Sequence, residues 1–372
     1  MMNSGEKTIL IGGTPFFREK MDGIGRFASQ VLLTLSAQHP EWRFKVVGFQ
    51  DEYCWRDQLV VKDNMEAIWL PFSRAYYKAR SLFAPLAADK HLAIMPDIYL
   101  ALDFTFTPWI RAPKKAVVIH DLAFRDLPQT VARRNRLYLS REVPRSLLQA
   151  DAAASVSEFT QSRLRSYYQK QLQEKEQILI PNGVDERFFS EVSEARKAQL
   201  RTRYQLPERF LLAVGTLEPR KNLSYLLKAF ALLPEQQQRN YPLVLVGKAG
   251  WGGDIISSSS YVQFTGYVED EDLPAIYHLA DAFVFPSLYE GFGIPVLEAM
   301  AAGTSVLSTD IDPVKEFAGD TIRYVPLDDL QVFAQALTTR STSQQLGAAR
   351  RIAQVFSWQH SVKQLEQWIE NV

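Results

Sequence analysis

Short apolar runs recur along the whole chain, separated by longer stretches in which apolar residues have helical spacing. A short apolar run bounded by turn residues is typical of a strand that is buried on both faces. Such runs predict strands at residues 8–12, 43–48, 67–70, 97–101, 116–120, 152–156, 178–180, 210–214, 242–246, 262–265, 282–285, 305–308 and 322–325. Amphipathic spacing predicts helices at residues 25–36, 134–148, 158–169, 223–232, 270–279, 295–302, 330–338 and 357–369.

The order of these elements predicts the fold class. Strands that alternate with helices form parallel sheets with helices on both faces, so we expect an α/β fold. The elements divide into two sets around the polar stretch 190–207, in which no strand is predicted. We therefore expect two Rossmann-like, doubly wound domains, residues 1–190 and 191–356. A ligand cleft is expected between the carboxyl ends of their strands.

Composition narrows the class of protein. The chain has 372 residues, 47% of them hydrophobic and 23% charged, which is typical of a globular protein with room for two domains. Because 42 basic residues balance 42 acidic ones, no global field favours nucleic acid. The single cysteine, Cys54, suits a reducing compartment. No run is long and apolar enough for a membrane span, so we expect a cytoplasmic protein.

Residues 282–303 form the most informative segment of the chain. A short apolar run is followed by Gly291 and Gly293, which permit a tight turn and a close approach of a ligand to the backbone. Pro295 suits the first position of a helix and Gly303 suits its C-terminal end. The predicted helix therefore offers free N–H groups and a positive dipole end, which together favour a phosphate.

Two carboxylates, Glu290 and Glu298, flank this predicted anion site. A carboxylate accepts hydrogen bonds from sugar hydroxyls, so the pair favours a molecule with hydroxyls at both ends and a diphosphate between them. A nucleotide sugar has this form. The alternative is that Glu290 is an ordinary loop residue and that Glu298 favours only the helix dipole.

A second loop, residues 214–222, follows the first predicted strand of the second domain. Its adjacent cations Arg220 and Lys221 precede Asn222, a candidate helix cap. Cations at this place can neutralise a diphosphate and stabilise it as a leaving group. A solvated basic turn is the alternative interpretation.

In the first domain, His120 and Asp121 follow a predicted strand. A histidine at that edge can donate to a sugar hydroxyl or exchange protons near neutral pH, or it can be tied to a backbone carbonyl. Asp121 either contacts substrate or caps the next turn. The glycines of 23–28, Gly23 and Gly25, suit an approaching acceptor or phosphate. They also match a weak dinucleotide fingerprint, which lies too far beyond the first strand and lacks the acidic partner.

Two stretches mix basic with aromatic or apolar residues and leave peripheral membrane contact open, although an ordinary solvated helix face is the favoured interpretation. Their members are Tyr76, Tyr77, Lys78, Arg80, Phe83, Leu86 and Lys90 in one stretch, and Arg133, Arg134, Arg136, Arg141 and Arg145 in the other.

Motif segments run in a fixed order through nearly the whole chain. They are Gly23-Ile-Gly-Arg, Ile119-His-Asp-Leu, Ser155-Val-Ser-Glu158, Ile180-Pro-Asn-Gly-Val-Asp185, Gly215-Thr-Leu-Glu-Pro-Arg-Lys-Asn222, Val246-Gly-Lys-Ala-Gly-Trp251, Thr265-Gly-Tyr-Val268 and the Glu290-x7-Glu298 segment. Together they resemble the retaining glycosyltransferases of family four, whereas Glu-x7-Glu alone would not be specific.

This resemblance implies a GT-B fold, in which two Rossmann-like domains face each other across a cleft, with the donor on the C-terminal domain and the acceptor largely on the N-terminal one. It implies that residues 357–372, around Trp358, pack back on the N-terminal domain. It also implies that Glu290 contacts the transferred sugar and Glu298 the ribose hydroxyls. By the same resemblance, the backbone of Phe292, Gly293 and Ile294 binds sugar or phosphate, and Arg220 and Lys221 bind the diphosphate. His120 lies near the anomeric centre, and the backbone of Tyr267 and Val268 contacts the base. Gly23 and Gly25 leave room near the phosphates and the acceptor.

One position departs from the family pattern. Many members carry Arg directly after the glycine that begins the diphosphate loop, where this chain has Thr216, and Arg220 is the expected substitute. This form of the loop resembles members that use GDP-mannose, which is therefore the expected donor.

The expected reaction is transfer of a hexose from a nucleotide diphosphate sugar to a saccharide or lipid-linked acceptor hydroxyl, with retention, in cell-surface polysaccharide assembly such as that of lipopolysaccharide. In such enzymes the leaving phosphate takes the acceptor proton, so Glu290 is expected to position the sugar rather than attack it. No cofactor and no metal are expected, because no cluster has metal-ligand spacing. The alternatives are a nucleotide-sugar epimerase or phosphorylase on the same fold, or a catalytically silent nucleotide-sugar-binding protein.

Overall fold

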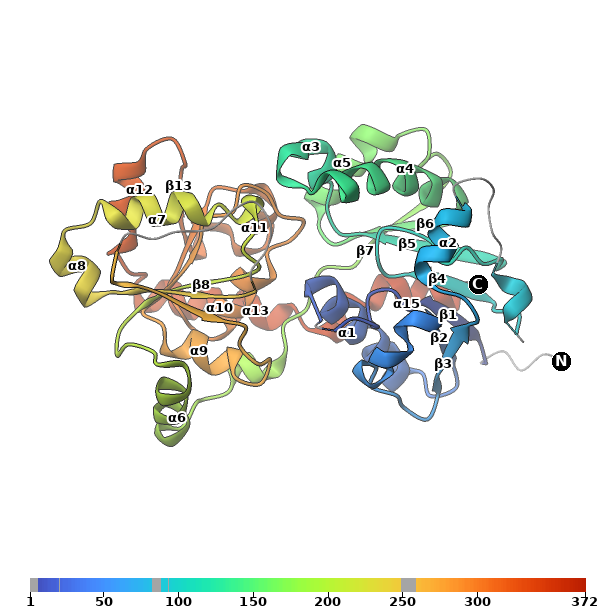
Figure 1. Cartoon of the computed structure of the whole chain (residues 1–372), viewed down its shortest axis with the longest axis horizontal. Helices are drawn as coiled ribbons and strands as arrows, with labels where there is room; N and C mark the ends of the chain where they lie inside the picture. The colour runs from blue at the N-terminus through green and yellow to red at the C-terminus, as the bar shows by residue number, and fades with distance from the viewer. Residues whose placement is uncertain (1–5, 20, 82–87, 93, 249–258) are drawn as a thin grey trace. The chain divides into compact units, whose positions relative to one another are not determined.

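The computed structural model describes residues 6–19, 21–81, 88–92, 94–248 and 259–372 (Figure 1). Residues 83, 86 and 249–251, which belong to two of the segments discussed above, lie outside these ranges. The chain divides into two compact units. Unit 1 contains residues 1–122, 134–182 and 358–372, and unit 2 contains residues 123–133 and 183–357.

Unit 1 is built on a seven-stranded parallel sheet with the order β3-β2-β1-β4-β5-β6-β7 in the described residues. Its strands are β1 (Thr8–Gly12), β2 (Arg43–Phe49), β3 (Met65–Leu70), β4 (Ile98–Ala101), β5 (Lys114–Ile119), β6 (Ala152–Ser155) and β7 (Glu176–Leu179). In β1, Ile9 pairs with Phe44 on one side and with Ile98 on the other. The chain therefore moves outward from β1 to β3 and returns to the opposite side of β1 at β4, which makes the β1–β4 edge the switch point of the sheet.

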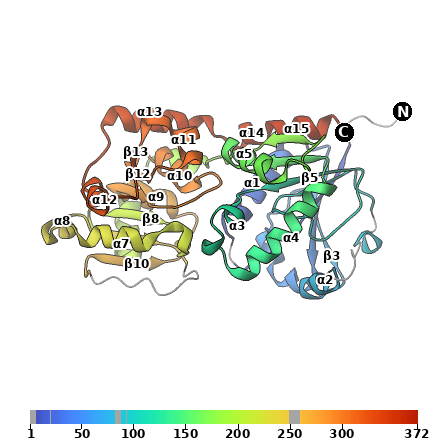
Figure 2. The same cartoon turned by 90° about the horizontal axis from the view of Figure 1, so that it is seen from above.

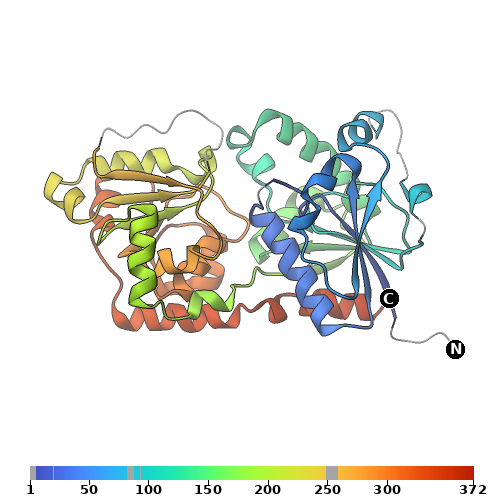
Figure 3. The same cartoon turned by 60° about the horizontal axis from the view of Figure 1, so that its bottom comes forward.

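Helices cover this sheet. They are α1 (Gly23–Gln38), α2 (Arg74–Ser81), α4 (Arg133–Gln149), α5 (Glu158–Tyr168), α14 (Trp358–Ser361) and α15 (Lys363–Glu370), with 3₁₀ turns η1 (Gln50–Gln58) and η2 (Asp89–His91). Figure 3 shows α1, in dark blue, beside the strands. Its apolar face is buried through Phe27, Val31 and Leu35. Asp22 caps the helix, since its carboxylate accepts from the Gly25 N–H at 2.9 Å.

The end of the chain returns to unit 1. Helix α14 contacts α1, and α15 contacts β7. The Lys7 Nζ donates to the Ile369 carbonyl at 2.9 Å, and His39 Nε2 lies 2.6 Å from the Glu366 carboxylate. These bonds join the two ends of the sequence within one unit.

Unit 2 is built on a six-stranded parallel sheet with the order β10-β9-β8-β11-β12-β13 in the described residues. Its strands are β8 (Leu211–Val214), β9 (Leu243–Val246), β10 (Val262–Gly266), β11 (Ala282–Phe285), β12 (Val306–Thr309) and β13 (Arg323–Val325). Strand β8 pairs directly with β11, so the loops that follow these two strands lie at the same edge. The core between this sheet and its helices includes Leu211, Phe230 and Phe333, each fully buried.

The unit 2 helices are α3 (Ala123–Asp126), α6 (Glu194–Tyr204), α7 (Leu223–Ala231), α8 (Glu235–Asn240), α9 (Leu273–Leu279), α10 (Ile294–Ala301), α11 (Asp312–Ala318), α12 (Leu330–Leu337) and α13 (Ser343–Val355), with 3₁₀ turns η3 (Pro128–Thr130), η4 (Glu186–Phe189), η5 (Pro219–Lys221) and η6 (Gly319–Thr321). Helix α13 lies along α10 and α11 (Figure 2). None of the described helices combines the length and hydropathy that a bilayer crossing requires.

The expected α/β fold with two doubly wound parallel sheets is confirmed. Every predicted strand is present, with ends within two residues of the prediction. The predicted helix at 357–369 is two helices, because α14 ends at Ser361 and α15 begins at Lys363. Helices α2, α3, α6, α8, α11 and α13 were not predicted, because most are short or strongly polar.

Candidate functional site

The loop between β11 and α10 carries the first part of the site. Gly293 has φ +116° and precedes α10, and a Cβ atom there would lie 2.8 Å from Val314 Cγ2. Glycine is therefore required at this turn for both conformation and space. At the far end of α10, Gly303 adopts φ +74° after the last helical residue, as predicted for a helix end.

Glu290 lies in this loop and is buried, with 7% of its surface exposed. Its Oε1 lies 2.7 Å from Lys221 Nζ, and its Oε2 forms an ion pair with Arg220 Nη1. The Arg220 side chain also bonds the Tyr289 carbonyl at 3.0 Å and the Glu218 carboxylate at 2.8 Å. The structure thus brings together three of the predicted site residues around one carboxylate.

The cations determine the charge state of Glu290. Burial alone would raise the pKa of the Glu290 carboxyl, but Arg220 and Lys221 outweigh it and lower the pKa from 4.5 to about 2. Glu290 is therefore ionised at neutral pH, so it accepts hydrogen bonds and does not donate a proton.

The β8–β11 pairing explains why these residues meet. The loop after β8 forms the turn η5, and the Leu288 N–H donates to the Arg220 carbonyl at 2.9 Å across the two loops. Asn222 occupies the N-cap position of α7 in a left-handed conformation, but its side chain makes no capping bond, unlike the expected helix cap. Thr216, the position that departs from the family pattern, is exposed, and its carbonyl accepts from the Glu218 N–H at 2.8 Å.

The start of α10 offers backbone donors. No hydrogen bond from the N–H groups of Phe292, Gly293 or Ile294 is found within the described part of the chain. The Phe292 ring faces the interior instead and stacks on Phe317 with centroids 4.9 Å apart. A buried ring therefore holds the loop, while its N–H groups and the helix dipole remain available for an anion.

Glu298 lies in the second turn of α10. It is buried, with 6% exposure, and its Oε2 accepts from the Tyr277 hydroxyl at 2.9 Å. Tyr277 in α9 therefore orients this carboxylate. Sequence reasoning missed Tyr277, because nothing in its local sequence indicates that α9 packs against α10.

The segment predicted to meet the base follows β10. Val268 is buried, and Tyr267 is half-buried with Lys248 Nζ 5.1 Å from the centre of its ring. Gly266 before them has φ +73° at a bulge of β10, which turns the chain at this point.

The first-domain candidates all lie in unit 1. His120 is buried, and its Nε2 donates to the Leu102 carbonyl at 2.9 Å, so the alternative of a histidine tied to a backbone carbonyl describes this geometry. Burial lowers the pKa of His120, although the Leu102 bond opposes this, so the ring is neutral at pH 7. Asp121 next to it is half-buried. The implied place of His120 near the anomeric centre stays a prediction.

The two glycines of the first helix differ from each other. Gly23 has open space where a Cβ atom would lie, whereas a Cβ atom on Gly25 would lie 2.7 Å from the Pro15 carbonyl oxygen. Gly25 is therefore needed for packing inside unit 1. Both glycines lie within α1 itself, which begins at Gly23.

One group of described residues has a metal-like arrangement. The ligand atoms of His39, Glu366 and Glu370 lie within 4.8 Å of one another. The His39 ring already lies 3.0 Å from the Glu41 carboxylate and stacks on Trp42 at 3.6 Å. This arrangement also serves to join α15 to the end of α1.

Comparison with known proteins identifies the family. The family described as "Glycosyl transferases group 1" matches residues 197–371. The chain is 30% identical over 268 residues to O-antigen chain mannosyltransferase B of Escherichia coli, covering 68% of this chain and 69% of that protein. The chain belongs to the glycosyl transferases group 1 family. It is a glycosyltransferase by this membership and is similar to mannosyltransferases, as the motifs indicated.

Two further proteins extend the comparison. Serotype-specific mannosyltransferase WbdA of Escherichia coli is 37% identical over 199 residues, which cover 48% of this chain but only 24% of WbdA. Sucrose-phosphate synthase from Thermosynechococcus elongatus has a TM-score of 0.72 at 21% identity, and the match covers 98% of both chains. This shared fold confirms the expected GT-B fold class.

Proposed function

We propose that the protein transfers a mannosyl residue from GDP-mannose to a hydroxyl of a saccharide or lipid-linked acceptor, with retention at the anomeric carbon. The similarity to O-antigen chain mannosyltransferase B and to WbdA supports the mannosyl group and a place in cell-surface polysaccharide assembly. The form of the loop at 215–222 supports GDP-mannose as the donor.

One observation carries the proposal, namely the Glu290 carboxylate held by both Arg220 and Lys221 beside the open start of α10. A diphosphate at the helix start would give the two cations a doubly charged partner in place of Glu290. Glu290 would then accept hydrogen bonds from hydroxyls of the transferred sugar. Glu298, whose carboxylate is oriented by the Tyr277 hydroxyl, would accept from the ribose hydroxyls.

The same groups account for the bond-breaking step. As the bond between the anomeric carbon and the phosphate oxygen breaks, negative charge grows on the diphosphate. Arg220, Lys221 and the α10 N–H groups stabilise this charge in proportion to its growth. The acceptor hydroxyl then bonds to the anomeric carbon and passes its proton to the departing phosphate, and Glu290 keeps the sugar in place.

A thermal-shift panel of GDP, UDP, ADP and dTDP sugars tests the donor, because a ligand that binds the folded state raises its stability. GDP-mannose should give the largest shift, and a larger shift with another nucleotide sugar would overturn the assignment of the donor. Donor consumption without an acceptor would indicate an epimerase or phosphorylase instead. Binding without turnover under any acceptor would indicate a catalytically silent binder.

We also propose that the protein works on the cytoplasmic side of the membrane, in peripheral contact with it through α4. This helix carries arginines together with Leu137 and Leu148, each 61% exposed. Sedimentation with anionic vesicles should exceed sedimentation with neutral ones, and equal sedimentation would refute the contact.

A further inference from the structure

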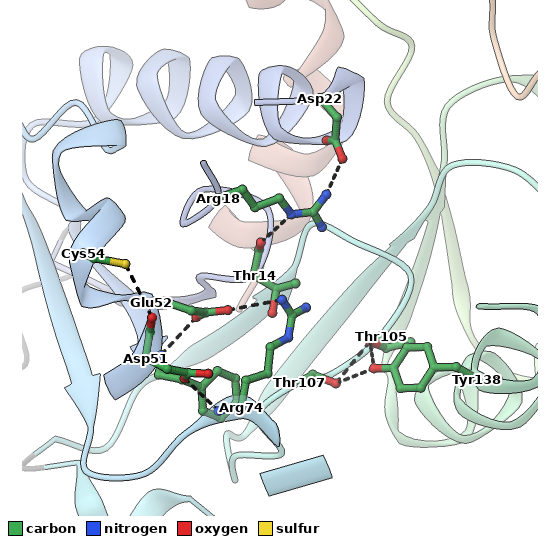
Figure 4. A network of polar contacts seen from close by, with 11 residues as sticks. Thr14, Arg18, Asp22, Asp51, Glu52, Cys54, Arg74, Thr105, Thr107 and Tyr138 are labelled. Carbon is green, nitrogen blue, oxygen red and sulfur yellow. Dashed lines mark hydrogen bonds and ion pairs between the residues drawn. The ribbon is translucent and has the colours of Figure 1, made fainter. Parts of the chain in front are cut away.

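A polar cluster lies at the carboxyl edge of β1 and β4, the switch point of the unit 1 sheet. Strand β1 runs into Thr14 and Arg18, and strand β4 runs into Asp103. Helix α2 contributes Arg74 and Lys78, whose charges act on Asp103. Figure 4 shows Thr14, Arg18 and Arg74 together with the residues they contact. We call Thr14, Arg18, Arg74, Lys78 and Asp103 the β4-edge cluster.

Asp103 is the unusual member of the cluster. It is 9% exposed, and no hydrogen bond or ion pair to its carboxyl group is found among the described residues. The buried Glu52 nearby accepts from the Phe49 N–H at 3.0 Å and from Arg74 at 3.2 Å. In unit 2, the buried Asp272 accepts from Arg203 at 2.9 Å and from Tyr204 at 2.7 Å. Glu52 and Asp272 thus have hydrogen-bond partners for their carboxylates, whereas none is found for the Asp103 carboxyl group in the described residues.

Two other polar atoms of the cluster also lack partners in the described residues. They are Thr14 Oγ1, on a side chain that is 3% exposed, and Arg74 Nε. Leaving a buried polar atom without a hydrogen bond is costly, so these two atoms, beside the unpaired Asp103 carboxyl group, point to a ligand that supplies the bonds.

The charges indicate what kind of ligand this is. Three cations, Arg18, Arg74 and Lys78, are matched by three acidic side chains. Asp22 pairs with Arg18 and Glu52 pairs with Arg74, and Asp103 is the third acidic side chain. A phosphate would meet these carboxylates, whereas a neutral polyhydroxyl compound offers O–H donors to Asp103 and oxygen acceptors to Arg74. The balance therefore favours a neutral sugar.

We propose that Asp103, Thr14 and Arg74 bind the neutral saccharide unit that carries the acceptor hydroxyl. The proposal rests on the glycosyl transfer proposed above and names the chemistry of its acceptor. Neighbouring sugar hydroxyls donate to the two Asp103 oxygens, Arg74 Nε donates to a sugar oxygen, and Thr14 completes the set. The Tyr138 hydroxyl, 3.2 Å from Thr105 Oγ1 and 3.0 Å from Thr107 Oγ1, fixes the loop after β4 in place.

Burial raises the pKa of the Asp103 carboxyl to about 7, against the opposing effect of Arg18 and Arg74. Asp22 raises the Asp103 pKa further and Lys78 lowers it. Arg18, Arg74, Asp22 and Lys78 are the charged groups that face Asp103. Since the folded-state pKa is raised above 3.8, stability is lost as pH rises through about 7. Asp103→Asn should therefore raise the melting temperature more at pH 8 than at pH 5. A melting temperature unchanged or lowered at pH 8 would overturn the picture of an unpartnered carboxylate.

The binding test uses methyl α-D-mannopyranoside as a neutral probe and mannose 6-phosphate as its charged counterpart, each with the full chain and GDP present. Saturation-transfer NMR should show the neutral mannoside bound, with binding weakened at least about tenfold in Asp103→Asn, the loss expected for a hydrogen bond to a charged group. Asp97→Asn is the matched control, because Asp97 accepts a structural bond from the Thr8 N–H at 2.8 Å at the other end of β4. It should leave probe binding unchanged.

Wild-type affinity in Asp103→Asn would overturn the proposal. So would preferential binding of mannose 6-phosphate that Arg74→Gln weakens, because the cluster would then be an anion site. GDP binding and donor turnover are measured separately on the same variants. If Asp103→Asn loses mannoside binding but keeps GDP binding, while wild-type protein never turns over GDP-mannose, the proposed function fails while the saccharide site stands.

Discussion

The ion pairs of Glu290 predict a stability effect that can be worked out from the structure. Each unit of difference between folded and unfolded pKa values corresponds to about 1.36 kcal/mol. A carboxyl group whose pKa falls from 4.5 to about 2 therefore stabilises the folded protein at neutral pH by about 3 kcal/mol. Glu290→Gln removes the charge and keeps the shape, so it should lose an amount of this order.

The loss appears as a lower melting temperature. For a unit of this size, about 1 kcal/mol shifts the melting temperature by roughly 2–4 °C, so unit 2 should melt roughly 6–12 °C lower in Glu290→Gln at pH 7. Because the folded-state pKa is depressed, the stabilisation is present above pH 4.5 and is lost as pH falls toward about 2. The difference in the free energy of unfolding between wild type and Glu290→Gln should therefore fall to about 1 kcal/mol at pH 3.

The same variant separates a positioning role from a purely structural one. Without Glu290, GDP no longer competes with a carboxylate for Arg220 and Lys221. GDP should therefore raise the melting temperature more in Glu290→Gln than in wild type, while mannosyl transfer is lost. Equal melting temperatures at pH 7, or a smaller GDP shift in Glu290→Gln, would refute this account of the ion pairs.

Three further predictions follow from the site. Lys221→Ala should lower kcat by about 10²-fold or more, because it removes stabilisation of the leaving group. Lys228→Ala, on the exposed face of α7, is the control and should leave kcat unchanged. Equal rates for the two variants would refute the leaving-group role of Lys221. Gly293→Ala should destabilise unit 2 by about 1–3 kcal/mol in urea unfolding, because Gly293 has φ +116° and an added Cβ atom would lie 2.8 Å from Val314. The loss should exceed that of Gly319→Ala, where φ is +50° and nothing lies within 4 Å of an added Cβ atom. Activity should survive extensive treatment with EDTA, because Arg220, Lys221 and the α10 N–H groups are proposed to stabilise the departing diphosphate. Loss of activity that added Mg²⁺ restores would contradict this.

The regular parts of the fold could be predicted from the sequence because they depend on local patterns. Strands such as 282–285 are buried on both faces and appear as short apolar runs. Helix α13 was missed although Thr342 and Gln345 form a capping box, a signal that would have marked its start. Helix α6 was missed because only Leu200 is buried along it, so its apolar periodicity is weak.

The candidate site was predicted only in part. The sequence marks Arg220, Lys221 and Glu290 as residues after strands, but it does not reveal that β8 and β11 are neighbours, which brings them together. Asp103 carried no signal, since its chemistry depends on burial without a partner. Such properties arise from tertiary packing and have no local pattern.

The most direct test of the central claim is an NMR assay of the product formed from GDP-mannose carrying ¹³C at the anomeric carbon, with methyl α-D-mannopyranoside as the acceptor. The account predicts a new glycosidic bond whose anomeric configuration is that of the donor, absent with Glu290→Gln. A product of inverted configuration, or transfer at the wild-type rate by Glu290→Gln, would contradict it.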